Sequence, residues 1–468
     1  MSLLDAAPGL LGMYGDFFGL SIVAPILPQW VRSKERSAQW VGYIMSGQYG
    51  GVVVGSFAFG ALADRFGNGV ALATCMAIDA TLFAASAFVP SPEWLLVVRT
   101  FAGLGAPQGL AIAWVAGVSS PHNLPKRMGL VAAVIHVGIL SGTICAGFVS
   151  WRAACLASAV PPLISLLVLA STKSPPVKRA QSRAAALAVG VRTLGFSSVV
   201  VTMLANGAEI TVHFVLLAVV LTENYGLSRQ QFALSLIPAA FVQIFNHFYL
   251  LPIVIRLATS FRLLTRLTQL MALIYVLVIL ANEVVPSSPW PLLVLQNLAY
   301  WLMSFTQGVG NFASAKHADD VAPEAKAALI GLGRAAFSLG NALAPSLLIA
   351  VYLAYNVRAA LAIILLLYTL AAGVSLCAAN HQEALLVVAD PRPSELDTDD
   401  FRLEYYYPPG GRRQQNENQR HNERRHNDRD AQPLVTSSSQ PRRLPLALTS
   451  PPQPASTPVG AAATTLAS

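Results

Sequence analysis

The chain has 468 residues, of which 54% are hydrophobic and only 12% are charged, and its mean hydropathy is +0.54. Soluble domains carry about 25% charged residues, so this composition excludes a water-soluble protein and indicates an integral, multi-pass protein of the plasma membrane or an endomembrane. The excess of basic residues behind the net charge of +8 predicts contact with anionic membrane lipid. A nucleic-acid partner is not expected, because no basic face is interleaved with stacking aromatic residues.

Apolar runs, each near the 20 residues that a bilayer-spanning helix needs, recur along the chain. They lie at 8–31, 40–62, 69–90, 94–118, 128–150, 153–172, 194–222, 231–256, 263–283, 288–313, 326–354 and 357–379. We therefore expect an all-α membrane protein with twelve transmembrane helices in two six-helix bundles, 1–172 and 194–380. A basic cytoplasmic linker, 173–193, would join them, as in transporters built from parallel repeats. The even count and the loop basicity favour cytoplasmic termini.

The last part of the chain, 381–468, has a different composition. Residues 412–430 are almost entirely polar or charged, and the segment from Pro433 onward is rich in Pro, Ser and Ala. Such a sequence buries too little apolar area to fold. We expect a disordered cytoplasmic tail that transport does not require.

Ionisable residues inside the apolar runs are the first candidates for a functional site. Asp16, Asp79 and Glu209 are the acids that lie away from loops, and Arg99 is the clearest base. Charges at membrane depth are costly and usually line a cavity. A position at a helix end, from which the side chain reaches water, is the structural alternative.

Polar residues at helical spacing mark the seventh, eighth and tenth runs. They are Asn206, Glu209 and His213; Gln243, Asn246 and His247; and Asn297, Tyr300, Ser304, Gln307 and Asn311. Isolated polar residues commonly hold membrane helices together. Three periodic stripes in one half fit a cavity lining better. From them we predict that substrate or protons bind at Asn206, Glu209, His213, Gln243, Asn246, Gln307 and Asn311.

Two motifs carry a resemblance to a known family. The stretch Gly60-Ala-Leu-Ala-Asp64-Arg65-Phe-Gly67 lies in a short gap between the second and third runs, and the first run contains Asp16 followed by Pro25-Ile-Leu-Pro28. The loop resembles the signature of the major facilitator superfamily. The first run resembles that of tetracycline/proton antiporters and vesicular monoamine transporters.

Further motifs agree in part. Arg99 with Gly103 and Gly105 is similar to the family's fourth-helix motif, in which the arginine is linked to proton transfer. Thr143 stands where the antiporters have a proline, and Asn68 stands where the family loop has an arginine. The second-half copy of the loop has lost its acid.

The resemblance implies the major facilitator fold and alternating access. Gly60, Asp64, Arg65 and Gly67 would gate the conformational change, with Asp64 facing the start of the eleventh helix near 325–329. Asp16 and Glu209 would face each other from opposite halves and bind a proton or a cationic substrate. Arg99 would tune a nearby acid.

The function that follows is proton-coupled transport of a small organic solute, of the drug or organic-cation antiport type. The alternatives are a facilitative uniporter of a neutral or anionic solute, with structural acids, and a transporter-like receptor or scaffold that signals through its tail. The chain contains no nucleophile elbow, phosphate loop or metal-spaced Cys/His motif. We therefore expect no enzyme, no cofactor and no metal site, and we expect a monomer.

Overall fold

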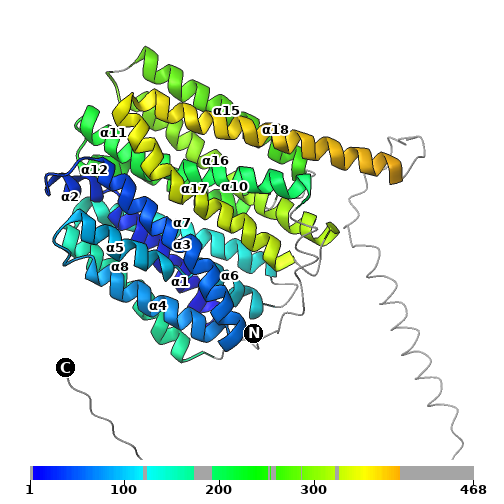
Figure 1. Cartoon of the computed structure of the whole chain (residues 1–468), viewed down its shortest axis with the longest axis horizontal. Coiled ribbons are helices and arrows are strands. Elements are labelled where there is room, and N and C mark those ends of the chain that lie inside the picture. Colours follow the sequence, from blue (N-terminus) through cyan, green and yellow to red (C-terminus); the bar gives the residue numbers. More distant parts are fainter. Residues whose placement is uncertain are drawn as a thin grey trace, which may run out of the picture. The chain divides into compact units, whose positions relative to one another are not determined.

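The computed structural model describes residues 4–119, 124–172, 192–250, 253, 260–285, 287–321 and 326–389. All regular elements in these ranges are helices (Figure 1). The first half, residues 4–170, contains η1 (Leu4–Ala6), α1 (Ala7–Val23), α2 (Leu27–Arg32), α3 (Gln39–Phe66), α4 (Asn68–Ala85), α5 (Pro92–Leu104), α6 (Gln108–Gly117), α7 (Leu124–Phe148) and α8 (Trp151–Ala170).

The second half, residues 194–389, is also helical. It contains α10 (Leu194–Thr211), η2 (Val212–Leu216), α11 (Leu217–Asn224), α12 (Arg229–Ser235), α13 (Ile237–Phe245), η3 (Asn246–Leu250), α15 (Ser260–Val284), α16 (Trp290–Val321), α17 (Lys326–Ala354) and α18 (Val357–Ala389). The all-α prediction is confirmed. The α18 helix continues nine residues beyond the predicted boundary at 380, because its apolar run is followed by residues with no helix breaker.

Nine of the described helical segments are long and apolar enough to cross a membrane. Helices α3 and α16, with 28 and 32 residues, have the length but are not among these nine, and the segment Gln230–Phe245 is shorter. These segments coincide with the second, tenth and eighth predicted runs. Polar and small residues lower the hydropathy of α3 and α16, so the count of twelve membrane-spanning helices stays a prediction.

Helix packing follows the same order in the two halves. In the first half α1 packs on α7 and α8, and α4 packs on α8. In the second half α10 packs on α17 and α18, and α15 packs on α18. The halves contact each other mainly through α3 against α17 and through α7 against α12, α13 and η3. The pattern is the one that two repeated units would form.

Glycine makes the tight turn and the close helix contacts possible. Gly67 has φ 95° and is the single residue between α3 and α4, which confirms the predicted turn, since a side chain is strained at positive φ. A Cβ at Gly142 would lie 2.6 Å from the carbonyl oxygen of Phe18, and one at Gly340 would lie 2.2 Å from that of Leu204. Helices α1 and α10 thus pack directly against the backbones of α7 and α17.

Three local features differ from straight spanning helices. The run predicted at 94–118 is broken between α5 and α6 at Gly105–Pro107, because proline has no N–H and disfavours a helical residue before it. The helix through Glu209 widens into a π-helical turn at η2, and the helix after α13 widens at η3. Such turns often occur at functional sites.

Candidate functional site

A buried carboxylate–amide pair occupies the first half. Asp16 on α1 is 6% exposed, and its Oδ2 accepts a 2.7 Å hydrogen bond from Nε2 of Gln108. Gln108 is the first residue of α6, so the break at Pro107 places its side chain against α1. The sequence identified Asp16 but not Gln108.

The same glutamine also bonds to a residue of the second half. Its Oε1 accepts a 3.2 Å hydrogen bond from Nη2 of Arg334 on α17. A guanidinium only donates and an ionised carboxylate only accepts, so these neighbours fix the orientation of the amide. Arg334 also lies over the ring of Phe337, at 4.5 Å from its centroid. Asp16, Gln108 and Arg334 thus form a hydrogen-bonded chain between the halves.

A second carboxylate–amide pair lies within the second half. Glu209 on α10 is fully buried, and its Oε1 accepts a 2.7 Å hydrogen bond from Nε2 of Gln296 on α16. Nε2 of Gln296 also contacts the hydroxyl of Tyr275 at 3.2 Å. Each half therefore holds one buried carboxylate on its first long helix, capped by a glutamine at the same distance. Glu209 was predicted, and Gln296 was not.

The residues beside Glu209 contact two different helices. The Asn206 Oδ1 accepts a 3.0 Å hydrogen bond from the Tyr368 hydroxyl on α18. His213, in η2, stacks on Tyr300 of α16 with ring centroids 3.9 Å apart. The predicted stripe is therefore divided, with Asn206 directed to α18 and the other two residues to α16.

The polar residues of the eighth run bond to α16. Gln243 Nε2 donates to the carbonyl of Tyr300 at 2.9 Å, and Asn246 Nδ2 donates to Ser304 Oγ at 2.9 Å. His247 packs on His136 of α7 with ring centroids 4.5 Å apart. Gln243 and Asn246 thus connect helices of the second half, whereas the histidine pair bridges the halves.

Asp79 and Arg99 form a separate buried group inside the first half. Arg99 is fully buried, its Nη2 donates to Cys155 Sγ at 3.9 Å, and it lies over the ring of Phe83. Asp79 is within electrostatic reach of both Arg99 and Asp16. Arg99 therefore contacts α8 and the Phe83 ring of α4, and it has no described contact with the chain that joins the halves.

The remaining predicted residues lie outside these contacts. Gln307 is half-buried, Asn311 is exposed, and neither forms a hydrogen bond within the described ranges. Gly60 lies in α3 with open space around it, and Arg65 lies over the neighbouring Phe66 ring. The side chain of Asp64 lies outside the described residues. Of its expected partners near 325–329, residues 326–329 form the start of α17 and Leu329 is buried, so the contact itself stays a prediction.

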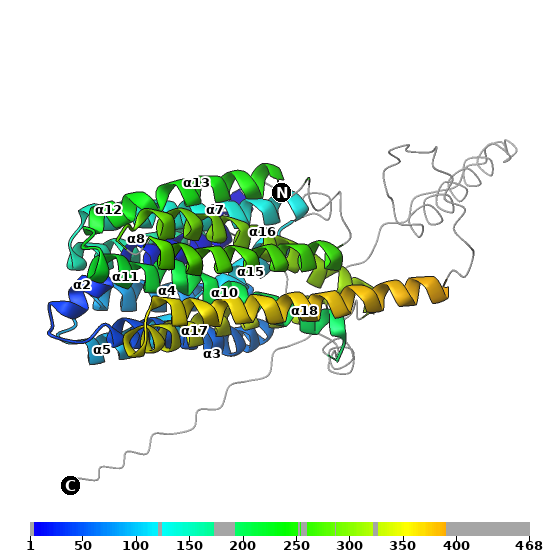
Figure 2. The same cartoon turned by 90° about the horizontal axis from the view of Figure 1, so that it is seen from above.

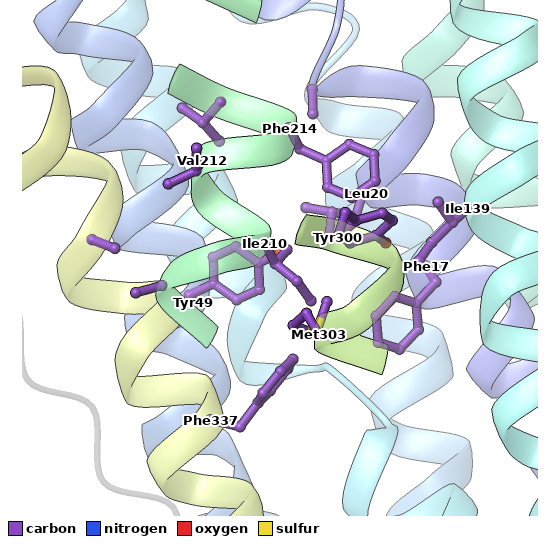
Figure 3. Close-up of a cluster of buried hydrophobic side chains, with 14 of the residues drawn as sticks. Phe17, Leu20, Tyr49, Ile139, Ile210, Val212, Phe214, Tyr300, Met303 and Phe337 are labelled. Carbon is purple, nitrogen blue, oxygen red and sulfur yellow. The ribbon is translucent and has the colours of Figure 1, made fainter. Parts of the chain in front are cut away.

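Apolar and aromatic side chains from both halves lie together in the buried core. Figure 3 shows one continuous cluster of Phe17, Leu20, Tyr49, Ile139, Ile210, Val212, Phe214, Tyr300, Met303 and Phe337. Several polar atoms near it have no hydrogen-bond partner among the described residues, including Glu209 Oε2, Tyr300 Oη, Arg334 Nε and both His213 nitrogens. Buried polar groups normally find partners, so these atoms are candidates for contact with a polar ligand.

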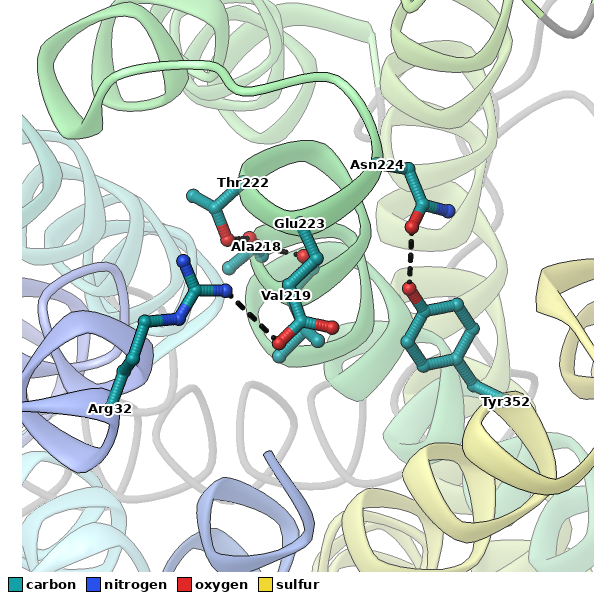
Figure 4. Close-up of polar contacts among 7 residues, drawn as sticks. All are labelled: Arg32, Ala218, Val219, Thr222, Glu223, Asn224 and Tyr352. Atoms are coloured by element: carbon teal, nitrogen blue, oxygen red, sulfur yellow. Dashed lines mark hydrogen bonds and ion pairs between the residues drawn. The ribbon is translucent and has the colours of Figure 1, made fainter. Parts of the chain in front are cut away.

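Contacts between the halves also close the end of the bundle opposite the start of α1. Helices α2, α11 and α12 gather there in Figure 2. Figure 4 shows Arg32 of α2 paired with Glu223 of α11, at 3.3 Å. Deeper in, Ser46 of α3 and Ser346 of α17 share a 2.8 Å hydroxyl–hydroxyl hydrogen bond. We call this end the far end; in this structure it is closed.

Three comparisons with known proteins agree. The chain is 28% identical to the niacin transporter NiaP of Acinetobacter baylyi over 165 residues, 34% of this chain and 38% of that protein. It is 29% identical to the class C tetracycline resistance protein of Escherichia coli over 167 residues, 33% of this chain and 40% of that one. It resembles the crystal structure of a D-xylose–proton symporter with a TM-score of 0.65 and 16% identity, over 80% of this chain and 96% of that chain.

The curated matches span less than half of either relative, so they identify the kind of protein more firmly than its substrate. The relatives are transporters and not enzymes, as the sequence predicts. No group of metal-binding side chains occurs among the residues that the structure describes. The sequence profile of the Major Facilitator Superfamily matches residues 10–345, and the chain is an integral, multi-pass membrane protein of that family.

Proposed function

We propose that this protein is a proton-coupled secondary transporter that moves a small organic solute by alternating access of two six-helix bundles, 1–172 and 194–380. The observation that carries the proposal is the chain from Asp16 through Gln108 to Arg334. It brings a buried carboxylate and a half-buried guanidinium together at the junction of the halves. Ionisable groups at such depth are expensive and are kept where they serve an ion or substrate path.

Alternating access assigns a role to the far-end contacts. Opening that end requires the Arg32–Glu223 pair and the Ser46–Ser346 hydrogen bond to break. Most of these groups are small or exposed, and exposed ion pairs contribute only about 0–1 kcal/mol each. The closed end is therefore held by interactions that a transport cycle can break and re-form.

Asp16 is the residue that we assign to proton coupling. Removing water from a carboxylate favours its protonated form, and opening of a path to Asp16 would restore water. The protonation state of Asp16 is also linked to the contact between the halves through Gln108. By thermodynamic linkage, protonation changes the conformational equilibrium by the same factor by which conformation changes proton affinity. Proton binding at Asp16 would thereby bias the movement of the halves.

Organic-cation antiport, which the first-run motif favours, is the second candidate. It is supported by Glu209, whose Oε2 has no hydrogen-bond partner among the described residues. Glu209 lies one turn before His213, which stacks on Tyr300. A carboxylate next to aromatic rings can bind an ammonium group. Glu209 rather than Asp16 would then contact the substrate.

Uptake into proteoliposomes tests the proposal with the solutes named in the relatives: nicotinate, tetracycline and D-xylose. We expect at least one to accumulate when a pH gradient is imposed, and Asp16→Asn to abolish that accumulation while solute exchange persists. Equal dependence on the pH gradient in the wild type and in Asp16→Asn would show a uniporter or a different coupling residue. Absence of flux for all three solutes in correctly inserted protein would favour the receptor or scaffold reading.

A further inference from the structure

Arg334 is a half-buried cation with few described partners. Its described contacts are the hydrogen bond to the Gln108 amide oxygen and the face of the Phe337 ring. Its Nε has no hydrogen-bond partner among the described residues. Neither contact carries a full negative charge, although a guanidinium is always protonated and offers five donors in a planar fork. The guanidinium therefore has donors that could bind a further acceptor.

No described carboxylate bonds directly to Arg334. Asp16 and Tyr49 are the titratable groups within electrostatic reach of Arg334, and Tyr49 is a buried phenol on α3. Asp16 is held one amide away, since Gln108 stands between them. When Asp16 takes up a proton, Arg334 loses its compensating charge and becomes a site for an external anion.

The other groups around Asp16 do not replace it as a counter-ion to Arg334. From α4, Asp79 and Cys75 are within electrostatic reach of Asp16, and Asp79 is shared with Arg99. From α7, His136 packs on His247, and from α8, Cys155 bonds with Arg99. Helix α6 contributes only the neutral Gln108.

We propose that Arg334 binds the carboxylate of a small aromatic monoanion and that it does so when Asp16 is protonated. The inference rests on the proposed transport function and specifies its substrate and coupling. One proton on Asp16 and one anion on Arg334 enter together and leave together, so net charge at the junction is unchanged. This is proton–anion symport with a ratio of one to one.

The aromatic part of the substrate follows from the surroundings of Arg334. Phe337 lies one turn along α17 and already stacks with the guanidinium. Figure 3 places Phe337, Tyr49 and Tyr300 around the same centre, on three different helices. The planar arginine fork matches a carboxylate, and a ring attached to that carboxylate packs on other rings. Arg99 offers no such site, because it lies within the first half against Cys155.

A binding experiment on purified full-length protein separates this inference from the transport proposal. The probes are benzoate, neutral benzamide and benzylammonium, which share one ring and differ in charge. We expect benzoate alone to bind, at least tenfold more tightly at pH 5.5 than at pH 8, as measured by calorimetry. Arg334→Gln should lose benzoate binding, and Arg334→Lys should keep a weaker form of it.

Asp16→Asn mimics the protonated carboxyl and should bind benzoate equally at both pH values. Arg358→Gln is the matched control. It also removes one positive charge, but Arg358 on α18 forms an exposed ion pair with Glu283 on α15. Stronger binding of benzylammonium, or benzoate binding that is absent or independent of Arg334, would overturn the inference. If benzoate binding failed in this way but pH-driven flux in proteoliposomes still required Asp16, the anion inference would be wrong and the transport proposal would stand.

Discussion

Replacing Gln108 by leucine should shift the protein toward the state that is open at the far end. Gln108 makes two hydrogen bonds to charged groups, and such bonds contribute about 1.5–3 kcal/mol each. The bond to Asp16 joins two helices of the first half, so it persists in both conformations and cancels. The bond to Arg334 crosses the halves and does not cancel. Its loss should raise the open-to-closed ratio roughly 10- to 150-fold.

Gln296→Leu is the matched control. It removes an amide that also contacts a carboxylate at 2.7 Å, but both of its partners, Glu209 and Tyr275, lie in the second half. Spin labels at residues 34 and 355, on exposed far-end loops of the two halves, report the opening by pulsed electron resonance. We expect a longer distance population for Gln108→Leu and the wild-type distribution for Gln296→Leu. Identical distributions for both variants would refute the idea that the Gln108 amide stabilises the closed junction.

Three further outcomes are expected. A disulfide formed in the double variant Ser46→Cys/Ser346→Cys should abolish transport until it is reduced, whereas each single variant should transport; activity in the oxidised form would mean that the far end does not open. Gly340→Ala should lower thermal stability by about 1–3 kcal/mol, because its Cβ would lie 2.2 Å from a backbone oxygen of α10, while Gly373→Ala on α18, with open space around it, should not; equal unfolding temperatures would contradict the packing. Truncation after Ala389 should leave flux unchanged, and loss of flux in inserted protein would assign the tail a role.

The sequence predicted those features that depend on one residue and its chain neighbours. Hydrophobic composition predicts the helices, the turn at Gly67 follows from the need for positive φ, and a carboxylate at membrane depth identifies Asp16 and Glu209. These inferences require no knowledge of which helices touch. They hold because burial of charge is costly wherever the helix packs.

The partners of those carboxylates could not be predicted in the same way. Gln108 and Gln296 are neutral, and only the three-dimensional packing brings them to the acids. Pro107 was the available signal for Gln108, because a broken helix exposes its first residue to a neighbouring helix. Arg334 lies inside the eleventh run and could have been recognised by the criterion that identified Arg99. The π-helical turns have no sequence signal that we can identify.

The two halves share a carboxylate–glutamine pair but differ in what that pair contacts. Each has a buried carboxylate on its first long helix and a glutamine that caps it at 2.7 Å. The first pair is extended across the junction by Arg334, whereas Glu209 is capped by groups of its own half. A proton that leaves Asp16 therefore changes the interaction between the halves, and one that leaves Glu209 changes the interior of one half. Coupling to movement requires an interaction that differs between conformations. On this argument Asp16 drives the cycle, and Glu209 and its aromatic neighbours determine what fits beside the substrate.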